Sequence, residues 1–121
     1  MNTANVQSAL DDAMLIDGAL GVCLVDYKSG MSLGTAGQSG LNLDVAAAGN
    51  TEVVKAKMKT MANLGLRDTI EDILITLGTQ YHLIRLVKNE DSLFLYLALN
   101  KANSNLAMAR HMLNGVEKKL G

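Results

Sequence analysis

The feature that most constrains the fold is a run of seven consecutive apolar residues, Leu93–Leu99. In an extended strand, successive side chains point to opposite faces of the sheet, so this run places apolar side chains on both faces. Such a strand is stable only where other elements cover both of its faces. We therefore expect Leu93–Leu99 to be a central strand inside a layered structure.

Four further strands are indicated by apolar runs, which are separated from one another by residues typical of turns. Residues 20–25 and 31–35 flank the turn residues 26–30 and predict a β-hairpin. Residues 70–77 and 81–86 flank a tight turn near Gly78, and their apolar residues alternate with others as in a strand. A charged turn, Lys88–Ser92, then leads into the central strand.

Three amphipathic helices are predicted from apolar residues that recur at every third or fourth position. The first begins near Val6 and ends near Gly18, the second spans Leu43–Leu64, and the third spans Asn103–Leu120. The apolar stripe of the second helix contains Ala47, Val54, Met58 and Met61. The stripe of the third contains Ala102, Leu106, Ala109, Leu113, Val116 and Leu120.

The length and order of these segments predict one domain, residues 1–121, of the α/β (α+β) class. The order is helix, two strands, helix, three strands, helix. Asn42 or Asp44 is expected to cap the second helix, and Gly65 to end it. Residues 34–42 are expected to form a loop, because they contain Gly34, Gly37 and Gly40 without a phosphate-binding motif.

The composition predicts a folded globular chain, with 49% hydrophobic and 19% charged residues. The net charge of −1 and the few aromatic residues argue against nucleic-acid binding. The chain shows neither a secretory signal nor an apolar run long enough to span a membrane, so we expect a cytoplasmic location. The single cysteine, Cys23, lies between Val22 and Leu24 and is expected to be a buried, unreactive thiol.

Catalytic and metal sites are not indicated. His82, His111 and Cys23 lie in different predicted elements, so we expect no metal and no cofactor. Glu71 and Asp72 are neighbours in a strand and must point to opposite faces. Together with Glu90 and Asp91 in the charged turn, they are expected to be solvated surface groups. The chain is therefore expected not to be an enzyme.

One charge run, Lys55, Lys57 and Lys59, lies in the second predicted helix. On a helix, residues 55 and 59 share a face and residue 57 points away. The run is either a solvated face or a surface that docks a partner. Glu52 and Asn63 lie at helical spacing on the same side as Lys55 and Lys59, which favours these four residues as candidate partner-binding residues.

Three stretches together resemble the roadblock / dynein light-chain domain family, and the bacterial single-domain members in particular. They are GVCLVDYKSG (residues 21–30), ILITLGTQYHLIRLV (residues 73–87) and NLAMARHMLNGVEKKL (residues 105–120). The order of elements matches from about Val6 to Leu120. The resemblance implies a profilin-like, five-stranded antiparallel sheet with helices on both faces, in the order α-β-β-α-β-β-β-α.

The resemblance also implies a homodimer in which the third strands pair and the middle helices pack side by side. An apolar strand at a sheet edge is an aggregation template unless another chain covers it. Pairing would cover that edge and bury the apolar stripe of the middle helix. The interface residues predicted in this way are Val54, Met58, Met61, Ile73 and Ile75.

The function that the resemblance implies is a non-enzymatic adaptor or regulator that binds a Ras-like small GTPase. The contact surface in the family is frequently the middle helix, which places Glu52, Lys55, Lys59 and Asn63 at the contact. No arginine lies within this helix, so it cannot supply an arginine finger. Two alternatives stay open, a sensor domain for a small ligand and a purely structural subunit of a larger assembly.

Overall fold

The structure, a computed structural model, describes residues 3–37 and 40–120. The order of elements is the predicted one, with three α-helices and five strands in the described residues. The elements are α1 (Thr3–Ala13), β1 (Ala19–Asp26), β2 (Met31–Ala36), α2 (Leu43–Asn63), β3 (Asp72–Thr76), β4 (Gln80–Leu86), β5 (Leu93–Asn100), the short 3₁₀ turn η1 (Lys101–Asn103) and α3 (Leu106–Leu120).

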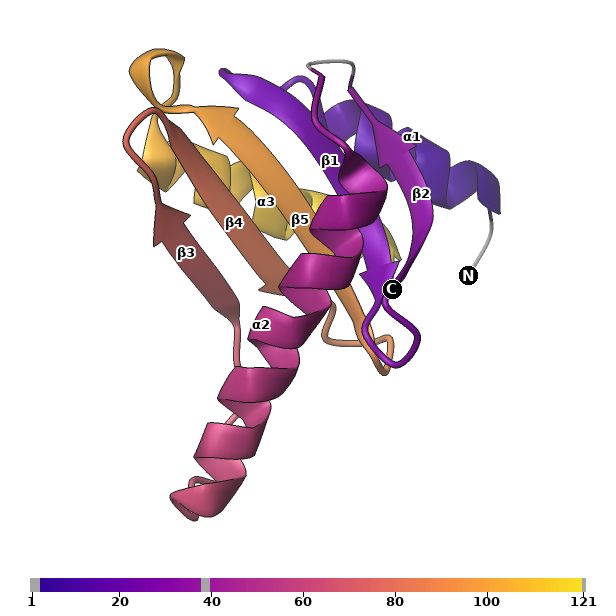
Figure 1. Cartoon of the computed structure of the whole chain (residues 1–121). Helices are drawn as coiled ribbons and strands as arrows, with labels where there is room; N and C mark the ends of the chain where they lie inside the picture. The colour runs from indigo at the N-terminus through magenta and orange to yellow at the C-terminus, as the bar shows by residue number, and fades with distance from the viewer. Residues whose placement is uncertain (1–2, 38–39, 121) are drawn as a thin grey trace.

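The strands form one antiparallel sheet in the order β2-β1-β5-β4-β3. The strand β5 lies in the middle of this sheet (Figure 1), and every residue of Leu93–Leu99 is buried. The prediction of a central strand is thus confirmed. The two edge strands, β2 and β3, each pair with one neighbour among the described strands.

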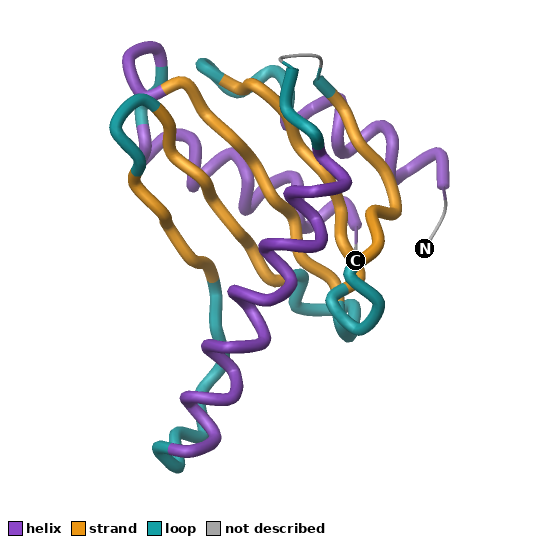
Figure 2. The backbone as a smooth tube through the Cα atoms, in the orientation of Figure 1, coloured by secondary structure: helices purple, strands orange, loops and turns teal. Residues whose placement is uncertain are grey.

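Helices cover both faces of the sheet, as Figures 1 and 2 show. The helices α1 and α3 pack on one face, on a core that includes Leu24, Leu83 and Leu97. The helix α2 packs on the other face, on a core that includes Phe94 and Tyr96. Because neighbouring residues of β5 enter different cores, the unbroken apolar run is explained by its burial on both sides.

The ends of α2 are set by the residues that the sequence indicated. The side chain of Asn42 accepts a hydrogen bond from the backbone N–H of Val45 at 3.1 Å, which makes Asn42 rather than Asp44 the N-cap. At the other end, Gly65 adopts a positive φ of 71°, and the N–H of Leu66 bonds to the carbonyl of Met61 at 2.9 Å. This left-handed residue closes the last turn of the helix.

The predicted start of the last helix is wrong. Residues 101–103 form the separate turn η1, in which the N–H of Ala102 donates to the side chain of Asn100 at 3.0 Å. The helix α3 starts at Leu106, and the side chain of Asn105 accepts from the N–H of Met108 at 3.1 Å. Two asparagines thus offer the backbone local hydrogen bonds that interrupt the helix. Ala102 is exposed and does not belong to the apolar stripe.

The other predicted boundaries need small changes. The helix α1 ends at Ala13, and turns continue the chain to Gly18. The strand β2 extends to Ala36, so the first residues of the loop predicted at 34–42 are strand. Gln38 and Ser39 of that loop lie outside the described residues.

Candidate interaction surfaces

The outer side of α2 carries the four residues predicted to bind a partner. Glu52, Lys55, Lys59 and Asn63 are all exposed. The opposite side of the helix is buried against the sheet through Ala47, Thr51 and Val54. The hydroxyl of Thr51 is buried and donates to the carbonyl of Ala47 at 2.8 Å, so it needs no other partner. The structure therefore brings the predicted residues together in one solvated row.

The two flanks of α2 face different edges of the sheet. A Cβ atom added at Gly30 would lie 3.8 Å from Oγ1 of Thr51 and 3.9 Å from Cα of Ala48, so this flank borders the β1–β2 hairpin. A helix turns by about 100° per residue, which puts Val53, Lys57 and Leu64 on the opposite flank. That flank faces the β3 edge, and it carries apolar surface.

The face of the sheet beside that flank is partly open. The helix α2 runs diagonally across the sheet, away from the C-terminal end of β3 and the N-terminal end of β4 (Figures 1 and 2). Ile75 of β3 lies there, half-buried and opposite His82 of β4. The ring of His82 meets the ring of Tyr96 edge-on at 5.3 Å, and its Nε2 lies 2.8 Å from Oε1 of Gln80. Burial lowers the pKa of His82, which favours the neutral imidazole.

The structure corrects the α2 part of the predicted dimer interface. Val54 is fully buried between α2 and the sheet of its own chain, so it has no surface with which to contact a second copy. The apolar neighbour Val53 is 37% exposed on the flank of α2 that faces the β3 edge. A helix stripe shows which residues are buried but not what buries them, and Val54 belongs to the protomer core. Met58 and Met61 are half-buried and line a groove between the end of α2 and the β4–β5 turn, so they lie apart from the flank that carries Val53 and Leu64.

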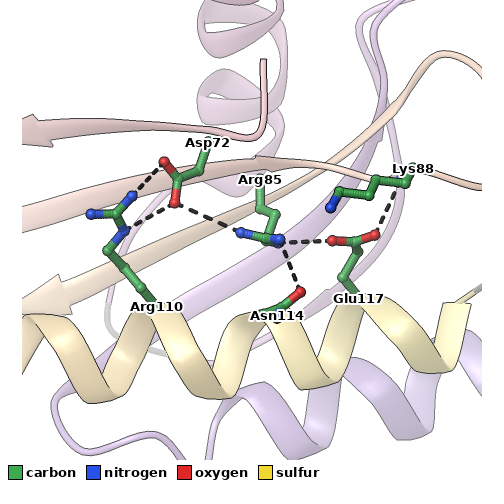
Figure 3. A network of polar contacts seen from close by, with 6 residues as sticks. All are labelled: Asp72, Arg85, Lys88, Arg110, Asn114 and Glu117. Carbon is green, nitrogen blue, oxygen red and sulfur yellow. Dashed lines mark hydrogen bonds and ion pairs between the residues drawn. The ribbon is translucent and has the colours of Figure 1, made fainter. Parts of the chain in front are cut away.

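A buried ion-pair network joins the β3 edge to α3 (Figure 3). The side chain of Arg85, on β4, lies at the centre. Its Nε donates to Glu117 at 2.8 Å, its Nη2 donates to Asn114 at 2.9 Å, and its Nη1 lies 3.8 Å from Asp72. Arg85 is 8% exposed and Glu117 is 5% exposed. Both charges are therefore buried and depend on these partners.

Further contacts complete the network at its two ends. Arg110 of α3 makes two hydrogen bonds to the carboxylate of Asp72, at 2.8 and 3.0 Å. The second oxygen of Glu117 accepts from the backbone N–H of Lys88 at 3.1 Å. The expectation that Asp72 is a solvated surface group is wrong, because its side chain is only 14% exposed. Arg85 lies directly opposite Asp72 in the β3–β4 hairpin, so the register of that hairpin indicates this pair. Arg110 lies 38 positions from Asp72, and no local pattern indicates it.

The network ties α3 to β3 and β4, and each of its carboxylates accepts hydrogen bonds from arginine or backbone donors. Glu117 is not among the residues predicted to be functional, although the sequence contains a signal for it. Glu117 follows Val116 and lies four residues after Leu113, so it borders the apolar stripe of α3. A carboxylate at such a position needs a buried cation, and Arg85 is the one lysine or arginine in the described strands.

Cys23 is buried, as expected. Burial, and to a smaller extent the charge of Asp44, raises the pKa of its thiol to about 12. The thiol therefore stays protonated at neutral pH. Among residues 3–37 and 40–120, no group of three or more His, Cys, Asp or Glu is placed to hold a metal ion. In the same residues, no helix combines the length and the apolar character that a membrane span requires.

Comparison with solved structures finds the same architecture in bacterial proteins. MglB from Myxococcus xanthus superposes with a TM-score of 0.87 at 16% identity, over 98% of this chain and 86% of that one. The gliding protein MglB from Thermus thermophilus gives a TM-score of 0.83 at 15% identity, over 98% and 87%. A Roadblock/LC7 domain from Streptomyces avermitilis gives 0.79 at 9% identity, over 98% and 93%. No protein-family model and no curated protein matches the chain.

The fold is thus a single-sheet α+β domain with one long helix on one face and two helices on the other. It is the Roadblock/LC7 fold, over nearly the whole chain. The fold that the resemblance implied is confirmed. At this level of identity the likeness concerns the fold, and the function has to be argued from the surfaces.

Proposed function

We propose that this protein is a non-enzymatic, homodimeric adaptor or regulator that binds a Ras-like small GTPase in the bacterial cytoplasm. The observation that carries the proposal is that α2 divides its surface between two kinds of contact. Its outer side is a polar row of mixed charge, and one flank is apolar beside an unpaired sheet edge. The likeness to MglB, a gliding protein, supports a regulatory role of this kind.

The apolar flank and the β3 edge suit a second copy of the chain. An edge strand offers unpaired backbone N–H and C=O groups to another strand. Two copies related by a twofold axis would pair their β3 strands and bring Ile75, Val53 and Leu64 of each copy into the interface. Such an interface would have an apolar centre and would leave the polar rows of both α2 helices in solvent.

The polar row suits a GTPase that the dimer recognises through charge. Glu52, Lys55, Lys59 and Asn63 would set the register and the association rate more than the affinity. Nearby exposed alanines, Ala48 and Ala56 among them, would supply the apolar contacts. Without an arginine in α2, any acceleration of GTP hydrolysis has to come from ordering the switch segments of the GTPase itself.

The double variant Lys55→Glu/Lys59→Glu is expected to weaken GTPase binding at least about tenfold, because two attractive pairs become repulsive. Titration calorimetry with a GTPase encoded in the same genome, in its GDP and GTP forms, measures the loss. Lys118→Glu/Lys119→Glu is the matched control, because it changes the charge equally at exposed positions of α3, on the other face of the sheet. Unchanged affinity in the first variant, or equal loss in the control, would reject this surface.

The purified protein alone is expected to hydrolyse neither nucleotides nor esters. Its described carboxylates lie in ion pairs or in solvent, and its cysteine is a buried thiol with a raised pKa. Turnover is measured with GTP, ATP and a p-nitrophenyl ester before and after a final size-exclusion step. Activity that follows the protein peak and disappears when His82 or Glu71 is changed to alanine would show that the protein is an enzyme.

A further inference from the structure

A groove lies beneath the C-terminal half of α2, apart from the polar row. Its volume is about 600 Å³, within the range of pockets that hold ligands. One wall is the end of α2, and the opposite wall is the β4–β5 turn together with the start of β5. The segment after α2, residues 66–71, closes one side. In Figure 1 this part of α2 projects beyond the sheet.

The interior of the groove is apolar and adaptable. Met58 and Met61 of α2 are half-buried in it, and Leu66 is 53% exposed. Leu86 and Leu93 line the opposite wall. Methionine side chains are flexible and polarizable, so they can repack around apolar residues of different shapes. Exposed apolar residues gathered in a groove favour an apolar partner surface over solvent.

The rim of the groove is acidic. Four carboxylates line it, those of Asp68, Glu71, Glu90 and Asp91, against the single ammonium group of Lys88. Lys28 pairs with Asp91 at 3.2 Å and offsets one of them. The whole chain carries a net charge of only −1, so negative charge is concentrated here. Such a rim attracts cations and repels acidic partners.

We propose that this groove docks a basic amphipathic helix of a partner protein. The apolar face of that helix would rest on Met58, Met61 and Leu66, and its lysines or arginines would meet Glu71 and Glu90. A helix that lays its apolar face into a methionine-rich groove is a general mode of recognition, and an acidic rim selects basic helices. The site differs from the polar row of α2, so one dimer can hold a GTPase and a basic helix together.

The test is a binding measurement with a fluorescent helical peptide built of leucine and lysine. The wild-type protein is expected to bind it, and to bind a leucine–glutamate peptide of the same pattern at least roughly tenfold more weakly. Glu71→Lys/Glu90→Lys is expected to lose most of the binding. Asp11→Lys/Asp17→Lys changes the charge equally at exposed positions on and beside α1, and is expected to bind as the wild type does.

A third variant tests the apolar interior. Leu66→Asn changes an exposed residue, so the fold should survive, and it should weaken binding even at high salt, where charge contacts are screened. The proposal is overturned if the lysine peptide does not bind, if both peptides bind equally, or if the control loses as much as the rim variant. A rim variant that changes the size of the protein's own oligomer would mean that another copy fills the groove, which also overturns it.

Discussion

Replacing Glu117 by leucine is expected to lower the free energy of unfolding by about 3–5 kcal/mol, the usual loss when one partner of a buried ion pair is removed. The reason is that the change leaves the buried charge of Arg85 without its main partner. Arg85 is only 8% exposed, and Glu117 is its nearest carboxylate, at 2.8 Å. Asp72 lies 3.8 Å away and already pairs with Arg110, so it replaces Glu117 only in part. Urea denaturation followed by circular dichroism measures the loss.

The double variant Arg85→Met/Glu117→Leu is expected to recover most of that stability. Apolar side chains of similar volume often replace a buried ion pair at little or no cost, because no charge remains to be desolvated. Lys118→Ala is the control on the same helix. It is exposed and is expected to change the stability by no more than about 0.5 kcal/mol. A double variant as unstable as Glu117→Leu would show that the unpaired arginine is not the cause.

The layered fold could be predicted because its main signals are local. An unbroken apolar strand requires cover on both faces, and β5 has it. Cap residues in the sequence mark where a helix begins and ends. The helix α2 begins after Asn42 and ends before Gly65, as these residues predict. The predicted start of α3 is wrong because Asn100 caps the start of the separate turn η1 and Asn105 caps the start of α3. Periodicity alone does not detect such a break.

The candidate surfaces could be predicted only in part, because burial depends on distant parts of the chain. The polar row of α2 follows from helical spacing, and the structure exposes all of it. The sequence marks Val54 as apolar but cannot show that the protomer's own sheet covers it. The ion pair of Arg85 with Glu117 joins residues 32 positions apart, and the groove gathers residues from Tyr27 to Leu93. No spacing rule reaches over such distances.

The change Ile75→Lys is expected to convert the proposed dimer into monomers. Ile75 lies on the edge strand β3, which pairs with β4 on one side only among the described strands. It is half-buried in the protomer, beside the part of the sheet that α2 leaves open. It is a better test position than Ile73, because Ile73 packs into the core beneath α2 and a lysine there would also disturb the fold. A twofold interface contains the new lysine twice, and each buried charge costs about a few kcal/mol. The dissociation constant of the dimer should therefore rise on the order of a thousandfold.

Sedimentation velocity at micromolar concentration measures the change, and thermal unfolding checks that Ile75→Lys remains folded. Leu33→Lys is the matched control. Leu33 is 51% exposed on β2, the other edge strand, so the same kind of substitution there should leave the dimer intact. Dissociation by Leu33→Lys alone would place the interface at the β2 edge. A wild-type protein that sediments as a monomer would contradict the proposed homodimer. The proposed function needs two copies joined at β3, because the polar rows of two α2 helices form its surface.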